Sequence, residues 1–433
     1  MRWCFGSVRL MLVLLLVGAG LGPAVPYSPG PGGATAAAST PGVLKIGLLA
    51  PTTGVAAAPG HDMINGWQLW WSQHGSTVAG VRIDTTYYDT ASNPNTALTQ
   101  VRRAIERDGV QLLIGPYLAN EGLAIAPYAE QHRVPLFLPT VSADDLTQRK
   151  ASPYVIKVAG WSSSLTTHPA GSWAYGKGYR TALTLGDAYA FAYESVGGFA
   201  QTFVEKGGRV VKQLWTPLGT TDFSPYLSQV RAAHPDMVFS CVVGADAVHF
   251  LQQWSSFGLK GEVPLVVQET VTDQSSIRTL PPDQVLGIIA FSHYAEGRDD
   301  ATTQRFVSDY AAANHTLPSY MAAGFYTAAQ WIQMAVRQVH GDVADQPKFL
   351  AAVRAVVLAD SPFGPQRLDS YGAPVENVYV REVQRVPARY ARYARTWNVV
   401  IKTYPNVSQF WTYSSQEYLK QPVYSNSFQG IAK

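Results

Sequence analysis

The sequence predicts an α/β protein with two Rossmann-like lobes, joined by a multi-strand hinge around a ligand cleft. Apolar runs alternate with helical segments from residue 43 to residue 140, and a second series of the same kind begins after residue 154. Such alternation is typical of a parallel sheet covered on both faces, which leaves the loops at the strand ends available to a ligand. With 433 residues, the chain is also too long for one ordinary core and suits two lobes.

In the first series, strands and helices are expected in strict alternation. The predicted strands, which are apolar runs bounded by turn residues, are 43–54, 81–90, 110–117 and 134–140. The predicted helices between them are 64–71, 95–109 and 120–132.

The second series repeats this organisation at low resemblance. Its predicted strands are 180–189, 209–217, 237–244, 263–270 and 285–294. Its predicted helices are 191–208, 224–235 and 247–258. The chain is expected to pass between the lobes near Trp161, return near Tyr294 and cross a third time near Phe363. Helical segments 305–315 and 320–340 are expected to pack on the first lobe. The predicted lobes are 43–160 with 292–345, and 161–291 with 346–433.

The first forty residues predict export. Arg2 and Arg9 precede the apolar run LMLVLLLV and then small residues, which is the layout of a secretory signal over residues 1–21. Residues 22–42 are rich in Pro, Gly and Ala and are predicted to be a tether. A periplasmic or secreted location follows. Cys241 is then the one remaining cysteine, so no intrachain disulfide is expected, and the surrounding FSCVV predicts a buried thiol.

Composition excludes several classes of protein. The formal charge is +3 and includes the two arginines of the signal, so the remaining body is nearly neutral and offers no footprint for nucleic acid. The run ARYARYAR near the C-terminus is basic, but it has acidic neighbours and is interpreted as a solvated strand edge or loop. Over residues 377–419, alternating residues predict an added hairpin followed by a Tyr-rich surface wrap.

Several of these segments resemble the branched-chain amino acid binding protein family, the type I periplasmic solute-binding proteins of ABC importers. The resemblance covers roughly Leu44 to Asp369. It rests on the motifs KIGLLAPTTG followed by Gly66, YYDTASNPNTALTQVRRAIERDGVQLLIGP, VPLFLPTVSADDLT, GDAYAFAYES and PDMVFSCVVGADAVHFLQQWSSFGL. It implies that a small-molecule ligand is captured by lobe closure and passed unaltered to a membrane permease. No cofactor or metal is implied, and a monomer is expected.

From the first lobe, the predicted ligand contacts lie in loops that follow strands. Asn120 is predicted to cap a helix whose free N–H groups face the cleft. Glu121 stands where the family commonly has a hydroxyl residue, so it either turns outward or meets a donor on the ligand. The resemblance implies further contacts from the next strand-end loop, namely Val141, Ser142 and Ala143, and the alternative for Ser142 is that it only caps the turn that follows. Pro59 is a candidate from a loop where the family often has an aromatic ring, and it departs from that pattern.

The second lobe and the crossings supply the remaining predicted contacts. Tyr189 and Phe191 match the place where the family has an aromatic lid, although core packing of these rings is the alternative. Glu269 falls where the family has an acid that pairs with an amino group, and a structural salt bridge is the alternative. Further candidate contacts are Val243, Trp161 and Tyr294.

Three functions remain at this point. A binding protein that delivers an amino acid, an amide or an aromatic derivative to a permease is favoured. An exported sensory module would share the fold and differ in its partner. An enzyme is disfavoured because the sequence has no G-x-S-x-G, P-loop, H-E-x-x-H or Cys/His cluster.

Overall fold

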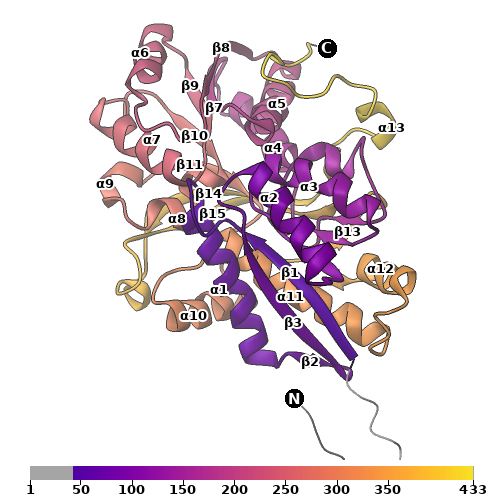
Figure 1. The fold of residues 1–433 in the computed structure, drawn as a ribbon. Coiled ribbons are helices and arrows are strands. Elements are labelled where there is room, and N and C mark those ends of the chain that lie inside the picture. The colour runs from indigo at the N-terminus through magenta and orange to yellow at the C-terminus, as the bar shows by residue number, and fades with distance from the viewer. Residues whose placement is uncertain (1–41, 433) are drawn as a thin grey trace, which may run out of the picture. The chain divides into compact units, whose positions relative to one another are not determined.

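The computed structural model describes residues 42–432. The predicted export signal and all of the predicted tether except Gly42 lie outside these residues. The described chain carries two mixed sheets (Figure 1), as predicted for two lobes. In this view, strands β7 to β10 occupy the upper part and strands β1 and β3 the lower part.

The first sheet has the strand order β2-β3-β1-β4-β5-β6. Its strands are β1 (Gly42–Ala50), β2 (Thr77–Val78), β3 (Val81–Asp89), β4 (Leu112–Ile114), β5 (Leu136–Phe137) and β6 (Val155–Ile156). All neighbours pair in parallel except β2 and β3. Strands β1, β4 and β5 are buried over most of their length, as expected for parallel strands covered on both faces.

The second sheet has the order β12-β13-β14-β11-β10-β9-β7-β8, with β15 paired to β14. Its parallel strands are β7 (Thr181–Asp187), β8 (Arg209–Thr216), β9 (Met237–Cys241), β10 (Leu265–Gln268) and β11 (Ile289–Ser292). Its antiparallel strands are β12 (Val357–Leu358), β13 (Gln366–Leu368), β14 (Pro374–Arg385) and β15 (Thr396–Val407). Cys241 is a free, buried thiol at the end of β9.

Helices accompany both sheets. With the first sheet go α1 (Ala57–His74), α2 (Pro94–Arg102), α3 (Ala119–Gln131), α10 (Ala301–Asn314), α11 (Tyr320–Gln338) and α12 (Gln346–Ala355). With the second go α4 (Ser163–Gly176), α5 (Ala190–Glu205), α6 (Ser224–Ala233), α7 (Gly244–Ser256), α8 (Gln274–Ile277) and α9 (Pro282–Val285). Helix α12 packs on α11, and the Trp331 indole donates to the Val353 carbonyl (2.8 Å), whereas the predicted lobe boundary at residue 346 separates these helices.

Two side chains of the loop between β3 and α2 form hydrogen bonds that order this part of the chain. The Asn93 side chain caps α2 by accepting from the amides of Asn95 and Thr96, and Pro94 occupies the first helical turn. The Asp89 carboxylate accepts from the Thr52 amide (2.9 Å) and so ties this loop to the loop after β1. These bonds hold the ends of two neighbouring strands together at the edge that faces the other lobe.

Gly66 marks a close contact between α1 and α11. A Cβ atom at this position would lie 2.0 Å from the Ala322 carbonyl oxygen, so the helices pack backbone to backbone. We expect Gly66→Ala to lower the free energy of unfolding by about 1–3 kcal/mol, because the helices must separate. Gly176→Ala is the control: nothing lies within 4 Å of its added Cβ, so its denaturation midpoint should hold or rise. Equal midpoints for the two variants in chemical denaturation would contradict the close-contact argument.

The C-terminal segment beyond β15 wraps over the second lobe and reaches the first. The predicted hairpin is present as β14 and β15, and the run ARYARYAR forms the turn between them. The segment then includes a short helix, α13 (Ser415–Tyr418), and its rings pack together. The Tyr424 hydroxyl bonds to His168 Nε2 on α4 (2.9 Å), while Arg149 of the first lobe donates to the Gln421 carbonyl (2.8 Å).

Candidate ligand-binding site

Side chains from both lobes surround one cavity. From the elements of the first sheet it is lined by Tyr117, Ala119, Thr140, Ser142 and Tyr320. From those of the second it is lined by Tyr189, Phe191, Val243 and Thr270, with Trp161 from the crossing segment. The free volume between these side chains is about 10 Å³. Since this is about the room of one water molecule, a larger ligand requires the lobes to separate or the rings to turn.

Helix N-termini from both lobes border the cavity. Helix α3 begins at Ala119, α5 begins after Tyr189 and α7 begins after Val243. In each case, the capping residue has an extended backbone and its side chain does not cap the helix. The N-terminal end of a helix carries a partial positive charge, so this end of the cavity favours an anion or a carbonyl oxygen.

The cavity wall combines rings with hydroxyl groups. Trp161 lies edge-on to Phe191, with ring centroids 5.8 Å apart, and edge-on to Tyr320 at 6.0 Å. Burial raises the pKa of Tyr117, Tyr189 and Tyr320, so their hydroxyls remain protonated donors at neutral pH. The Trp161 indole Nε1 is buried without a hydrogen-bond partner. The arrangement therefore suits an aromatic ligand that carries hydrogen-bond acceptors.

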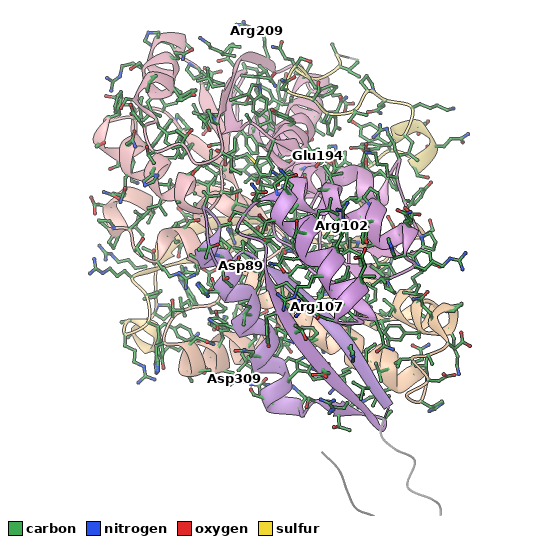
Figure 2. All side chains as sticks on the ribbon, in the orientation of Figure 1. Asp89, Arg102, Arg107, Glu194, Arg209 and Asp309 are labelled. Carbon is green, nitrogen blue, oxygen red and sulfur yellow. The ribbon has the colours of Figure 1, made fainter. Side chains whose placement is uncertain are left out.

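Polar contacts join the lobes around this cavity. Arg278, which follows α8, forms an ion pair with Asp62 on α1, with 2.5 Å between Nη2 and Oδ2. The Tyr320 amide donates to the Asp273 carboxylate (3.0 Å). On another side, the Asp144 amide donates to Glu194 (3.0 Å), which Figure 2 labels in the middle of the molecule. Because these bonds require the lobes to be in contact, they stabilise the closed arrangement.

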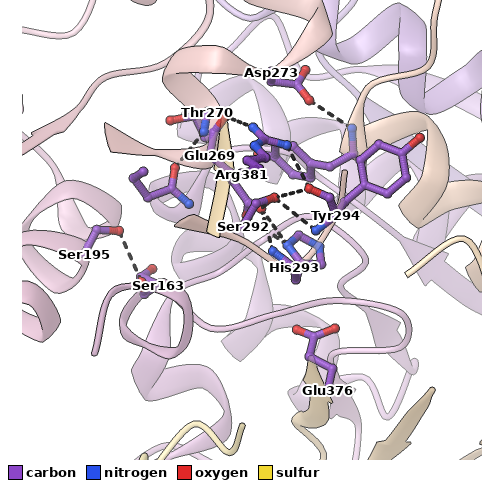
Figure 3. A network of polar contacts seen from close by, with 12 residues as sticks. Ser163, Ser195, Glu269, Thr270, Asp273, Ser292, His293, Tyr294, Glu376 and Arg381 are labelled. Atoms are coloured by element: carbon purple, nitrogen blue, oxygen red, sulfur yellow. Dashed lines mark hydrogen bonds and ion pairs between the residues drawn. The ribbon is translucent and has the colours of Figure 1, made fainter. Parts of the chain in front are cut away.

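Glu269 lies behind the cavity wall rather than in it. Its carboxylate accepts from His293 Nδ1 at 2.8 and 2.9 Å and from the His293 amide at 3.0 Å, and the Ser292 hydroxyl also donates to it (Figure 3). The Arg381 guanidinium donates to the Glu269 carbonyl (2.7 Å). Glu269 and His293 are both fully buried. The structure thus places Glu269 in an internal ion pair, which is the alternative expected from the sequence.

Asn120 and Glu121 differ from their predicted roles. The N-cap of α3 is Leu118, so the prediction that Asn120 caps the helix is wrong. The Asn120 side chain accepts from the neighbouring Glu121 amide (3.0 Å) and does not line the cavity. Glu121 neither turns outward nor faces the cavity: it is fully buried and accepts from the Leu118 amide (3.0 Å). Burial raises the pKa of Glu121 to about 7.

The cavity brings together Ser142, Trp161, Tyr189, Phe191 and Val243 from the predicted set. The predicted contacts that are buried but do not line it, besides those already described, are Val141, Ala143, Tyr294 and Pro59. Val141 packs against the position of Gly122 on α3, and Tyr294 packs against Phe363. Pro59 is not in a loop, as predicted, but inside the first turn of α1.

Sequence reasoning missed five lining residues. Tyr117 and Thr140 end predicted strand segments of the first lobe, and the strand-end argument applied to Val141 and Ser142 could have included them. Thr270 directly follows Glu269. Ala119 is the residue before Asn120. Tyr320 opens a helix that was expected only to pack on the first lobe, and its sequence carries no local signal for a cavity.

Neither a metal site nor a membrane-spanning helix is found within residues 42–432. No group of three or more His, Cys, Asp or Glu side chains there could hold a metal ion. Among the helices of this range, none has the length and apolarity required to cross a membrane.

Two α/β lobes that enclose a cavity between the ends of their strands define a two-lobed solute-binding protein. Comparison with known proteins agrees: residues 43–388 match the family model described as periplasmic binding protein. The chain belongs to this family, whose members bind solutes and are not enzymes.

Individual relatives are distant but match over most of their length. The chain is 25% identical over 356 residues to the Leu/Ile/Val-binding protein homolog 6 of Brucella melitensis, covering 81% of this chain and 90% of the relative. The ABC transporter substrate-binding protein of Sphaerobacter thermophilus is 28% identical with a TM-score of 0.78, covering 85% and 99%. A solute-binding protein of an ABC transporter from Rhodopseudomonas palustris, in complex with 3,4-dihydroxybenzoic acid, is 27% identical with a TM-score of 0.79, covering 85% and 98%.

Proposed function

We propose that this protein captures an aromatic carboxylic acid between its lobes, outside the cytoplasmic membrane, and delivers it unaltered to the membrane permease of an ABC importer. One observation carries the ligand class: among the described residues, the cavity is lined by aromatic rings and hydroxyl-bearing side chains, without an acidic or basic one. A carboxylate would accept from the N–H groups of α3 and from hydroxyls such as that of Ser142, while the ring would lie among Trp161, Tyr189 and Phe191.

The solved relatives support this ligand class. Solute-binding proteins of Rhodopseudomonas palustris at 25–27% identity were solved in complex with 3,4-dihydroxybenzoic acid, benzoate and 4-hydroxybenzoate. Their association with ABC transporters, together with the export pattern of residues 1–21, supports delivery to a permease from the outer side of the membrane.

An aliphatic amino acid is the second candidate ligand. The names of the curated relatives favour it, because they are homologs of Leu/Ile/Val-binding proteins. An amino acid carries an ammonium group, which needs an acceptor inside a closed cavity. The described lining offers hydroxyls and carbonyls but no carboxylate, so we place this candidate second.

Thermal-shift measurements decide between the two ligands. We expect benzoate, 4-hydroxybenzoate and 3,4-dihydroxybenzoate to raise the melting temperature, because a ligand at about 100 times its Kd adds about 2.7 kcal/mol to stability. Leucine, isoleucine and valine at the same concentrations should leave it unchanged. A shift with leucine and none with the aromatic acids would overturn the proposed ligand class. Loss of labelled benzoate uptake on deletion of the gene would be the matching test of delivery.

A further inference from the structure

Both carboxylate oxygens of the acid next to the cavity already have hydrogen-bond partners. Glu269 immediately precedes Thr270, which lines the cavity. Its carboxylate accepts from the His293 ring, the His293 amide and the Ser292 hydroxyl. Burial opposes ionisation of Glu269, but the facing imidazolium holds its pKa below the usual range. Glu269 in turn holds the pKa of His293 above its usual value against the effect of burial.

Aromatic rings of the cavity wall contact this ion pair. The His293 ring is stacked between Trp161 (centroids 5.4 Å apart, planes at 21°) and Phe363 (4.8 Å, 7°), and Tyr320 meets its edge at 5.5 Å. Trp161 and Tyr320 also line the cavity, so the ion pair lies directly beside its wall. Figure 3 shows Glu269 and His293 facing each other beside Tyr294.

We propose that His293 determines the charge class of the ligand: it occupies the Glu269 carboxylate and so selects carboxylic acids that lack an α-ammonium group over α-amino acids. An ammonium group enters a closed cavity at a large desolvation penalty unless an anion receives it. Three buried acids lie beside the described lining, namely Glu269, Asp273 and Asp187. Asp187 and Asp273 accept from the backbone amides of lining residues, whereas Glu269 has both of its oxygens within hydrogen-bond distance of His293 Nδ1. This inference rests on the proposed function, because it concerns the ligand of the same cavity.

Phenylacetate and phenylglycine form a matched pair of probes, since they share a skeleton and differ by the α-ammonium group. We expect the wild-type protein to prefer phenylacetate. His293→Gln removes the cation while leaving a polar side chain, and should shift the ratio of the two Kd values toward phenylglycine by at least tenfold in isothermal titration calorimetry. The double variant His293→Gln/Glu269→Gln should lose that gain. An unchanged ratio in His293→Gln would overturn the inference.

Glu269→Gln is the second variant, and it decides the question if His293→Gln does not fold. A glutamine still accepts a bond from His293, and we expect the ratio of the two Kd values to equal that of the wild type. A selective loss of phenylglycine binding in this variant would overturn the inference, because it would show that Glu269 already serves the ligand. The proposed function fails differently: a wild-type protein that binds no aromatic acid would refute it whatever the variants do.

Discussion

Unfolding this protein is expected to require a few kcal/mol more at pH 6 than at pH 8, because several buried carboxyl groups prefer to be protonated. Burial raises the pKa of Glu121 and of Glu376 to about 7, and that of Asp273 to about 6. It also raises the pKa of Glu194 and Asp187 well above the usual range.

The direction in which stability changes with pH follows from the number of protons bound in the folded and unfolded states. A carboxyl whose pKa is higher in the folded protein binds more protons there than in the unfolded chain, so stability falls as pH rises through that interval. For Glu121 and Glu376 the interval runs from the usual glutamate pKa of 4.5 to a folded pKa of about 7. Each pKa unit corresponds to about 1.4 kcal/mol. Each of these two groups therefore contributes about 1 kcal/mol between pH 8 and pH 6.

His168 opposes this trend and sets the acidic limit. Burial lowers its pKa from the usual histidine value of 6.5 to about 3. A histidine with a depressed folded pKa binds fewer protons than the unfolded chain, so it lowers stability as pH falls below about 6.5. Above pH 5, the stability lost through His168 as pH falls is smaller than the stability gained through the buried carboxyls. We therefore expect the free energy of unfolding to be largest near pH 5.

Urea denaturation at pH 5, 6, 7 and 8 tests this expectation. Glu121→Gln and Glu376→Gln should each reduce the difference between pH 8 and pH 6 by about 1 kcal/mol, because each removes one titrating group. Glu382→Gln is the control: Glu382 lies on the same strand, β14, as Glu376, but it is partly exposed rather than buried. A stability that rises steadily from pH 6 to pH 8 would contradict the role assigned to the buried carboxyls.

The sequence was sufficient for the architecture because the signals of strands and helices are local. Apolar runs and helical spacing predicted both sheets and the C-terminal hairpin, since burial on both faces of a parallel sheet leaves a continuous apolar pattern. Boundaries were less accurate: residues 134–140 were predicted as a strand, of which β5 occupies Leu136–Phe137. The extent of this strand is set by its pairing with β4 and β6, and pairing partners are not visible in local sequence.

The details of the site depend on contacts between residues far apart in the chain. Glu121 resembles an ordinary first-turn acid, but the loop that contains Thr90 and Asn93 buries it. Resemblance predicted Glu269 as a ligand contact, but its actual partner is His293, which lies 24 residues later in the chain. Pro59 was expected in a loop because Pro and Gly usually break helices. Gly60 instead lets the start of α1 approach the backbone at Pro51, which no local pattern reveals.

Replacement of Trp161 by alanine is expected to have the second large effect, on stability and on binding together. Trp161 is 1% exposed, lines the cavity and stacks on His293. Removal of a buried aromatic side chain typically costs about 3–5 kcal/mol of stability. Trp254→Ala is the matched control, because Trp254 is equally buried but lies in the separate core of the second lobe. It should lower stability by a similar amount and leave the Kd for benzoate unchanged.

Trp161→Phe separates the ring from the indole N–H. Phenylalanine keeps a ring that can stack on His293, so we expect most of the stability to remain. The indole Nε1 is buried without a partner in the described structure, and buried indole N–H groups usually find an acceptor. If a ligand oxygen is that acceptor, Trp161→Phe should weaken benzoate binding by about 1 kcal/mol, the usual net worth of a hydrogen bond. If calorimetry gives the wild-type Kd for Trp161→Phe, Trp161 contributes only apolar contacts to the cavity. The donors to the carboxylate would then be the hydroxyls and the N–H groups of α3.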